Sequence, residues 1–205
     1  MHKLTLPDFE KNKRTLYFEK GTNPFFHLDI INFFYFIKSG KIKVFDINFK
    51  TGKEQILYIL SVGDMFDIKS LLNKEPFKYS LEVIEDVEMI EIPSSDVHHM
   101  IETNDKFKEY FYSYISNQLN YVENLVIDIS LHTVYERMIH LFYNFAKKST
   151  DKINTSVLNN LTQDDLAAMI GTVRKVFNKN LKKMKNEHLI EVKRKNITIN
   201  DELLD

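Results

Sequence analysis

Short apolar runs separated by turn residues fill the first part of the chain, up to Pro93. All four prolines and four of the five glycines lie in this part. The runs between them are rich in β-branched and aromatic residues, which is typical of strands. They predict strands at residues 33–37, 42–47, 55–60, 81–84 and 87–92. Short strands with frequent turns indicate a small antiparallel barrel or sandwich.

After Pro93 the apolar positions recur at intervals of three and four, which is the period of an α-helix. Ser94 or Ser95 is expected to cap a short helix that runs through Glu102. One continuous apolar stripe then extends over about 25 residues, or roughly 35 Å of helix. The stripe consists of Phe107, Phe111, Tyr114, Ile115, Gln118, Leu119, Val122, Leu125, Val126 and Ile129.

This long helix has more apolar surface than a small barrel can cover. Pairing with a second copy buries such a seam, and the alternative is a helix that packs wholly within its own chain. The sequence therefore predicts a homodimer. The interface is predicted at Phe111, Ile115, Gln118, Leu119, Val122, Leu125 and Val126.

The remaining part of the chain predicts three more helices and a hairpin. A helix from Thr133 to Lys147 is expected to bury Met138, Leu141, Phe142 and Phe145, and the polar residues 148–160 are expected to form a loop.

Two helices joined by a glycine turn follow this loop. Thr162 is expected to cap the first helix, whose opening turn carries Asp164 and Asp165, as the helix dipole favours. Gly171 supplies the turn, and Thr172 is expected to cap the second helix. This order of elements predicts a helix-turn-helix.

The second of these helices has an apolar side and a basic side. The apolar side is predicted at Val173, Val176, Phe177, Leu181 and Met184. The opposite side holds Arg174, Lys175, Asn178, Lys179, Lys182 and Lys185. A recognition helix needs this arrangement, since one side is fixed to the domain and the other enters the major groove. Arg174 is the candidate for reading guanine, and Asn178 for adenine or a phosphate.

A basic hairpin completes the pattern, because residues 186–199 predict two alternating strands, which is typical of a wing. Residues 171–195 hold nine basic and two acidic residues, a net charge of +7 in a chain of net charge −1. A charge run alone is usually a solvated surface. Its agreement with the turn, caps and hairpin predicts binding to double-stranded DNA. The predicted contacts are Thr162, Gln163, Thr172, Val173, Arg174, Lys175, Asn178, Lys179 and Lys182.

Composition excludes several classes of function. The chain has no cysteine, which rules out disulfides and a cysteine-held iron–sulfur cluster. It has neither an apolar stretch of about 20 residues nor an apolar leader, so a cytoplasmic protein without a membrane partner is predicted. The neighbouring His98 and His99 point about 100° apart on a helix, and Asp64–Ile68 offers no metal ligands together. No catalytic residue, metal site or enzyme activity is predicted.

Several motifs resemble the Crp/Fnr regulators, the relatives of the cyclic AMP receptor protein. Phe36–Val44 looks like the barrel strand and turn of this family, and Thr51–Glu54 and Gly63–Phe66 look like the next two turns. Leu161–Gly171 and Leu189–Asp201 resemble its helix-turn-helix and wing. The resemblance covers nearly the whole chain.

The resemblance implies an α+β fold in three parts. These are a cyclic-nucleotide-binding-like antiparallel β-barrel (a double-stranded β-helix) at 1–100, a long dimerisation helix at 101–130, and a winged helix-turn-helix DNA-binding domain at 131–205. It also implies a sequence-specific transcription regulator that acts as a homodimer on a palindromic site. An effector would shift the population of the DNA-competent state, and RNA polymerase is a partner if the protein activates.

The effector site departs from the family pattern. Cyclic-AMP-binding members have Phe-Gly-Glu where this chain has Phe66-Asp67-Ile68, and Arg-Ser where it has Tyr79-Ser80. The anion clamp and the ribose acceptor are both missing, so an effector other than cyclic AMP is predicted. The predicted effector-site residues are Phe66, Ile68, Lys78, Tyr79, Ser80 and Gln118.

The nature of the effector and cofactor stays open at this point. The alternatives are a small organic molecule, a haem held by His27 or a methionine, a protein partner, or no effector. Aromatic residues of the barrel either line a pocket or simply fill the core. The alternative function is accordingly a haem- or effector-binding sensor module with DNA binding secondary. The recognition helix also differs from many relatives, since Lys175 stands where they have glutamate, so a different DNA half-site is expected.

Overall fold

The computed structural model describes residues 13–24, 28–73, 77–148, 160–193 and 196–199. The chain divides into two compact units. The first unit comprises Met1–Phe45 and Tyr58–Val122, and the second comprises Asp46–Leu57 and Glu123–Asp205. Among the described residues, no helix combines the length and the apolar content that are needed to cross a membrane.

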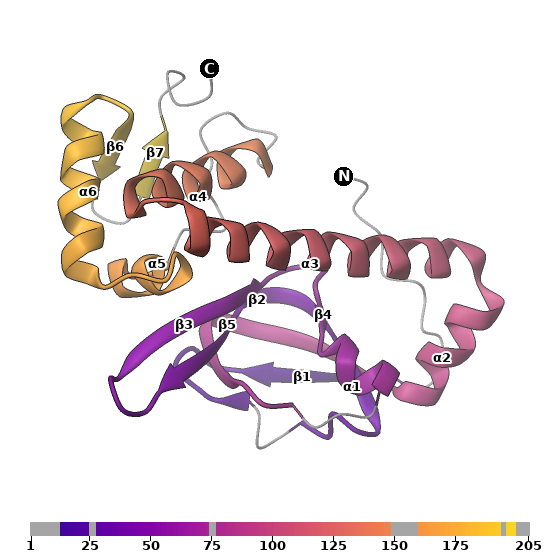
Figure 1. Ribbon diagram of the computed structural model, residues 1–205. Helices are drawn as coiled ribbons and strands as arrows, with labels where there is room; N and C mark the ends of the chain where they lie inside the picture. Colours follow the sequence, from indigo (N-terminus) through magenta and orange to yellow (C-terminus); the bar gives the residue numbers. More distant parts are fainter. Residues whose placement is uncertain (1–12, 25–27, 74–76, 149–159, 194–195, 200–205) are drawn as a thin grey trace. The chain divides into compact units, whose positions relative to one another are not determined.

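One β-sheet, whose strands differ in length, forms the frame of the N-terminal half (Figure 1). Its order is β1-β5-β2-β3, and β4 pairs with β2 in antiparallel fashion. The sheet is not closed among the described residues, but the antiparallel strands wrap around an apolar core as expected for this fold class. The strands are β1 (Arg14–Phe18), β2 (Phe33–Asn48), β3 (Lys53–Leu60), β4 (Met65–Phe66) and β5 (Ser80–Pro93).

All five predicted strands are present, but four of them merge into two long strands. Residues 33–37 and 42–47 lie in β2, and residues 81–84 and 87–92 lie in β5. The resemblance implied a strand and a turn within Phe36–Val44, whereas β2 continues through this range and bends at Gly40 through shifts in its register with β5. Gly40 has φ +81°, and a Cβ at this position would lie 2.0 Å from the carbonyl oxygen of Asp86. Only glycine therefore fits the bend.

Both faces of β2 are buried, which explains its continuous apolar run. Phe34 and Phe36 belong to one core cluster, and Tyr35 and Ile37 belong to another. Phe66 joins the second cluster. These four aromatic and aliphatic side chains and Phe66 fill the core. This agrees with the interpretation that the aromatic residues of the barrel are core residues rather than the lining of a pocket.

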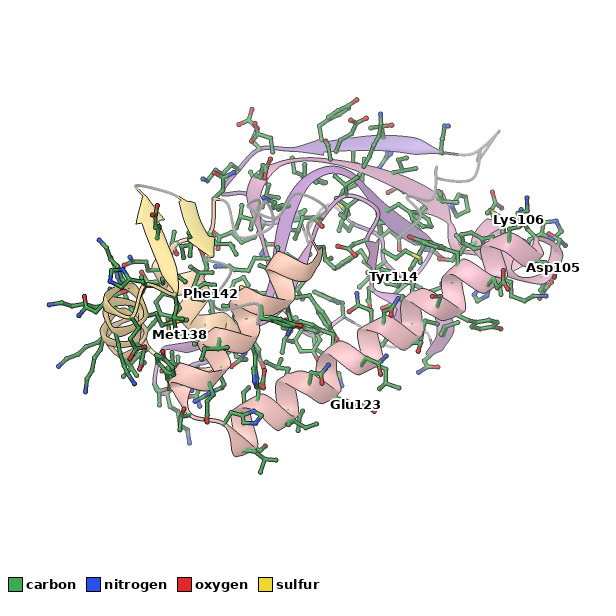
Figure 2. The ribbon with its side chains drawn as sticks, turned by 90° about the horizontal axis from the view of Figure 1, so that it is seen from above. Asp105, Lys106, Tyr114, Glu123, Met138 and Phe142 are labelled. Carbon is green, nitrogen blue, oxygen red and sulfur yellow. The ribbon has the colours of Figure 1, made fainter. Side chains whose placement is uncertain are left out.

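Three helices follow or interrupt the strands of this half, and the third is much the longest. The short helix α2 begins without the predicted serine cap, because Pro93 occupies the cap position and no side chain caps it. Phe107, Phe111 and Tyr114 are buried in the first unit, and Tyr114 points from α3 towards the strands (Figure 2). The helices are α1 (Ile68–Asn73), α2 (Ser94–Thr103) and α3 (Asp105–Leu131).

The burial of Phe111 corrects its assignment to the dimer interface. Its side chain is 0% exposed and belongs to the core formed with Phe34 and Phe36. The beginning of α3 therefore packs within its own chain. The alternative to dimerisation had expected this for the whole helix.

The second unit contains three helices and a two-stranded hairpin. Met138 and Phe142 of α4 are fully buried and are labelled on that helix in Figure 2. Leu141, which was predicted to be buried, is only half-buried. The side chain of Phe145 and the predicted loop at 149–159 lie outside the described residues. The elements are α4 (Val134–Lys148), α5 (Gln163–Met169), α6 (Arg174–Asn186), β6 (Ile190–Lys193) and β7 (Asn196–Ile199).

Candidate nucleic-acid interface

A capping box fixes the start of α5. The Thr162 hydroxyl accepts a hydrogen bond from the Asp165 amide at 3.1 Å, and the Asp165 carboxylate accepts one from the Thr162 amide at 2.9 Å. Two amides that the helix leaves without partners are thus satisfied. The predicted cap at Thr162 is confirmed.

The turn between α5 and α6 depends on Gly171, which has φ +68°. The Thr172 amide donates to the carbonyl of Ala167 at 2.9 Å, and Arg137 of α4 donates to the carbonyl of Ile170 at 2.6 Å. The predicted glycine turn is confirmed. The predicted cap at Thr172 is wrong, because Val173 occupies the cap position of α6 and no side chain caps that helix.

One side of α6 is fixed in the core by Phe177, Leu181 and Met184. Val173 and Val176 were also predicted on this side, but they are 53% and 37% exposed. Val173 is the cap residue of α6 and Val176 lies in its first turn, whereas the three buried residues lie further along the helix. Asn180, which interrupts the apolar side, donates to the carbonyl of Val176 at 3.0 Å and so satisfies its polar group locally.

The other side of α6 is a row of exposed lysines, namely Lys175, Lys179, Lys182 and Lys185. Within the described part of the chain, these four make no ion pair. Lys183 differs, because its ammonium lies 4.2 Å from the centre of the Tyr135 ring and 3.8 Å from Glu187. Burial and a hydrogen bond to Glu187 raise the pKa of Tyr135 to about 12, so this tyrosine stays protonated while it ties α4 to α6.

The two predicted base-reading residues, Arg174 and Asn178, have different environments within the protein. Arg174 is paired with Asp164 at 3.0 Å, and both side chains are more than half exposed. An exposed pair of this kind is worth at most about 1 kcal/mol, so DNA can displace it. The amide oxygen of Asn178 is buried without a hydrogen-bond partner among the described residues, so this amide is turned partly away from the lysine row.

The predicted wing is an antiparallel hairpin of β6 and β7. Ile190 pairs with Ile199, and Lys193 pairs with Asn196. The basic tip at 194–195 lies outside the described residues. A capped helix, a glycine turn, a helix with a lysine row and a hairpin thus follow each other in the order that a winged helix-turn-helix requires.

Comparisons with known proteins agree with both halves of this architecture. The model of the cyclic nucleotide-binding domain matches residues 15–104, and the model of the Crp-like helix-turn-helix domain matches residues 136–203. The chain belongs to the Crp/Fnr family. Its members are transcription regulators rather than enzymes, and the helix-turn-helix of this regulator is a DNA-binding element.

Named relatives give the same result. The regulator is 24% identical to the CRP-like cAMP-activated global transcriptional regulator of Mycobacterium tuberculosis over 169 residues. These residues cover 82% of this chain and 75% of that protein. It is 22% identical over 167 residues to the cAMP-activated regulator CRP of Pasteurella multocida, 80% of this chain and 79% of that protein. The structure of FixK2 from Bradyrhizobium japonicum shares the fold, with a TM-score of 0.77 at 12% identity over 94% of this chain and 96% of that one.

The predicted effector-site residues of the regulator have different environments. Phe66 is buried, and its ring contacts Phe77, which in turn contacts Tyr79. Ile68 and Ser80 are half-buried, whereas Lys78 is exposed. The structure therefore joins Phe66 and Tyr79 through Phe77, which the sequence reading had not included.

Gln118, the last of the predicted effector-site residues, belongs to a network within the first unit. Its amide donates to the Tyr114 hydroxyl at 2.8 Å. That hydroxyl donates to the Asp64 carboxylate at 3.3 Å. Burial and the neighbouring Asp64 charge hold the pKa of Tyr114 far above its usual range, so the hydroxyl keeps its proton and remains a donor.

Asp67 stands where cyclic-AMP-binding members of the family have glycine. Its φ of 54° is in the left-handed region that favours glycine. Its carboxylate accepts hydrogen bonds from the Ser70 hydroxyl and, at 3.4 Å, from the Ser70 amide. Asp67 thus has a glycine-like backbone conformation, and its acidic side chain lies at the first turn of α1.

The exposed part of the apolar stripe begins in the middle of α3. Leu119 and Val126 are 58% and 57% exposed, and Val122 and Leu125 are half-buried. Ile115 packs against the core of the first unit. Ile129, the last residue of the predicted stripe, is exposed, and so are the neighbouring Ile127 and Leu131, which the prediction did not include.

Sequence reasoning missed one cluster, which consists of Asp128, His132 and His140. Asp128 and His132 are four residues apart, which places them on the same face of a helix. That spacing is visible in the sequence. The approach of His140 is not, because it depends on how α4 folds back against the end of α3.

Proposed function

We propose that this regulator acts as a homodimer on a palindromic DNA site, with α6 of each copy in the major groove. The observation that carries the proposal is the exposed lysine row of α6 opposite its buried side. The proposed parts of the chain are a sensor at 1–100, a dimerisation helix at 101–130 and a DNA-binding domain at 131–205. Two such helices would read half-sites about one helical turn, or roughly 34 Å, apart.

The proposed DNA contacts differ in role. Arg174 near the start of α6 is the candidate for reading a base, because a guanidinium can donate two hydrogen bonds to guanine. The lysines further along are proposed to hold phosphates, together with the exposed Thr162 and the half-buried Gln163 and Thr172 at the helix ends. Val173, Lys175, Asn178, Lys179 and Lys182 complete the proposed contact set.

The test compares Arg174→Ala with Lys182→Ala on a site selected from random duplexes. Arg174→Ala is expected to reduce discrimination at one base position by about 1–3 kcal/mol, because one bidentate contact is lost. Lys182→Ala is expected to weaken binding to all sequences alike and to reduce the salt dependence by about one phosphate contact. Fluorescence anisotropy at several salt concentrations measures both effects.

A control for these variants is Lys183→Ala, because Lys183 is occupied by Tyr135 and Glu187. It is expected to leave the salt dependence unchanged. If Arg174→Ala kept the full sequence preference, the proposed position of α6 on DNA would be wrong.

We further propose that the effector is not cyclic AMP, although the curated relatives are named cAMP-activated. The Asp67 carboxylate and its hydrogen bonds to Ser70 occupy the first turn of α1, and a carboxylate repels a phosphate. The exposed Lys78 and the neutral Tyr79 stand where the family has an arginine clamp. We propose that the effector is a different small molecule and that the regulator acts on DNA in the cytoplasm. RNA polymerase would be a partner if the regulator is an activator.

Calorimetric titration with cyclic AMP is expected to show no binding, since the anion clamp and the ribose acceptor are both absent and each unpaired polar group costs about 1–3 kcal/mol. A cyclic-AMP-binding member of the family, titrated under the same conditions, is the positive control. Saturable heat at one equivalent of cyclic AMP per chain would contradict this part of the proposal.

A further inference from the structure

Three side chains with metal-binding chemistry meet where the end of α3 and the middle of α4 lie together. One carboxylate oxygen of Asp128 lies 3.0 Å from Nδ1 of His132 and 2.7 Å from Nδ1 of His140. The two imidazole rings are 4.8 Å apart and nearly perpendicular. All three side chains are between one fifth and two fifths exposed, so an ion from solvent can reach them.

The geometry is close to that of a metal-binding triad. One ligand atom from each of the three residues lies within 4.8 Å of the other two. Ligands about 2.0–2.1 Å from a tetrahedral Zn²⁺ ion lie roughly 3.3–3.4 Å from one another. The two distances from the Asp128 oxygen, 3.0 and 2.7 Å, are shorter than this value. Side-chain rotations that move the three ligand atoms slightly apart would therefore admit an ion.

The donor set indicates which ions fit. Two imidazole nitrogens and one carboxylate oxygen, with an open position for water, suit Zn²⁺ and related divalent transition metals. Mg²⁺ and Ca²⁺ prefer oxygen ligands only. The charge of the surroundings also favours a cation, because Glu136 is close enough for its carboxylate to interact with both histidines.

We propose that Asp128, His132 and His140 bind one divalent transition-metal ion, with Zn²⁺ as the best fit. Each histidine would bind the ion through its Nδ1 lone pair, with a proton on Nε2. The ion replaces the two hydrogen bonds to Asp128 with three coordination bonds. It thereby links the end of α3 to α4, the first helix of the part that carries the helix-turn-helix.

The binding test uses the full chain without a histidine tag. Titration with ZnCl₂ is expected to show one equivalent bound per chain, and CoCl₂ is expected to give the intense visible absorption of a tetrahedral site. His132→Gln and His140→Gln should each weaken Zn²⁺ binding by at least about 100-fold, since loss of a ligand exceeds the 10–100-fold effect of losing an outer partner. Glutamine keeps a hydrogen-bond donor for Asp128, and circular dichroism checks the fold of each variant.

The matched control is His99→Gln, which changes an exposed histidine of α2 outside the cluster and is expected to bind Zn²⁺ like the unmodified chain. The proposal is overturned if the unmodified chain binds no stoichiometric metal, or if His132→Gln and His140→Gln bind it unchanged. In either case the triad is only a hydrogen-bonded link between two helices. The octahedral spectrum of weakly bound Co²⁺ would also overturn it.

An effect of the metal on DNA affinity rests on the proposed function and is measured separately. Anisotropy with and without Zn²⁺ is expected to differ for the unmodified chain and not for His140→Gln. Metal binding without DNA binding would overturn the DNA proposal alone, and DNA binding without metal binding would overturn the metal site alone.

Discussion

A chain that carries both Leu119→Glu and Val126→Glu is expected to be a monomer in solution, whereas the unmodified chain is expected to be a dimer. Leu119 and Val126 are both more than half exposed on α3. They are seven residues apart in the sequence and belong to the same apolar stripe. Glutamate at these positions would place unpaired carboxylates in the predicted dimer interface. Each unpaired charge that is buried there destabilises the dimer by about 3–5 kcal/mol. Even one such charge raises the dissociation constant roughly a thousandfold.

Sedimentation velocity over a range of concentrations measures this effect. The control is the pair Asn117→Glu and Asn124→Glu, which adds the same charges to exposed positions away from the stripe and is expected to remain dimeric. An unmodified chain that sediments at the mass of one copy would remove the argument from the long helix. A dimeric double variant would move the interface elsewhere.

Local chemistry explains which elements could be predicted from the sequence. The cap at Thr162 and the turn at Gly171 depend on residues within a few positions of each other, so their residue types alone indicate them. The merging of strands at Gly40 depends instead on Asp86, which lies on β5 far along the chain. A glycine with positive φ looks the same in sequence whether it closes a turn or bends a strand.

Burial was harder to predict than secondary structure. The helical period correctly indicated Phe177, Leu181 and Met184, but it also included Val173 and Val176, which are exposed. A period identifies one side of a helix and does not say how far the neighbouring element extends along it. The same reason accounts for the missed cluster, since His140 meets Asp128 only through the approach of α4 to α3.

The apolar stripe of α3 shows the same limit and has two different uses along its length. Phe111 lies with Phe107 in the core of the first unit, whereas Leu119 is exposed. Residues with the same period thus stabilise the fold at one end of the helix and are available for a partner further along it. Stability measurements on single chains can separate these two uses.

Phe111→Ala is expected to lower the free energy of unfolding of the first unit by about 3–5 kcal/mol, because it removes a fully buried ring and leaves a cavity. Phe49→Ala is the matched control, since Phe49 is 93% exposed and its loss should change stability by no more than about 0.5 kcal/mol. Urea unfolding, followed at several protein concentrations, distinguishes the core from the interface. A loss of stability that is the same at each concentration places Phe111 in the core, because the cavity exists in each copy by itself. If Phe111→Ala only shifted the dimer towards monomer and left unfolding unchanged, Phe111 would belong to the interface after all.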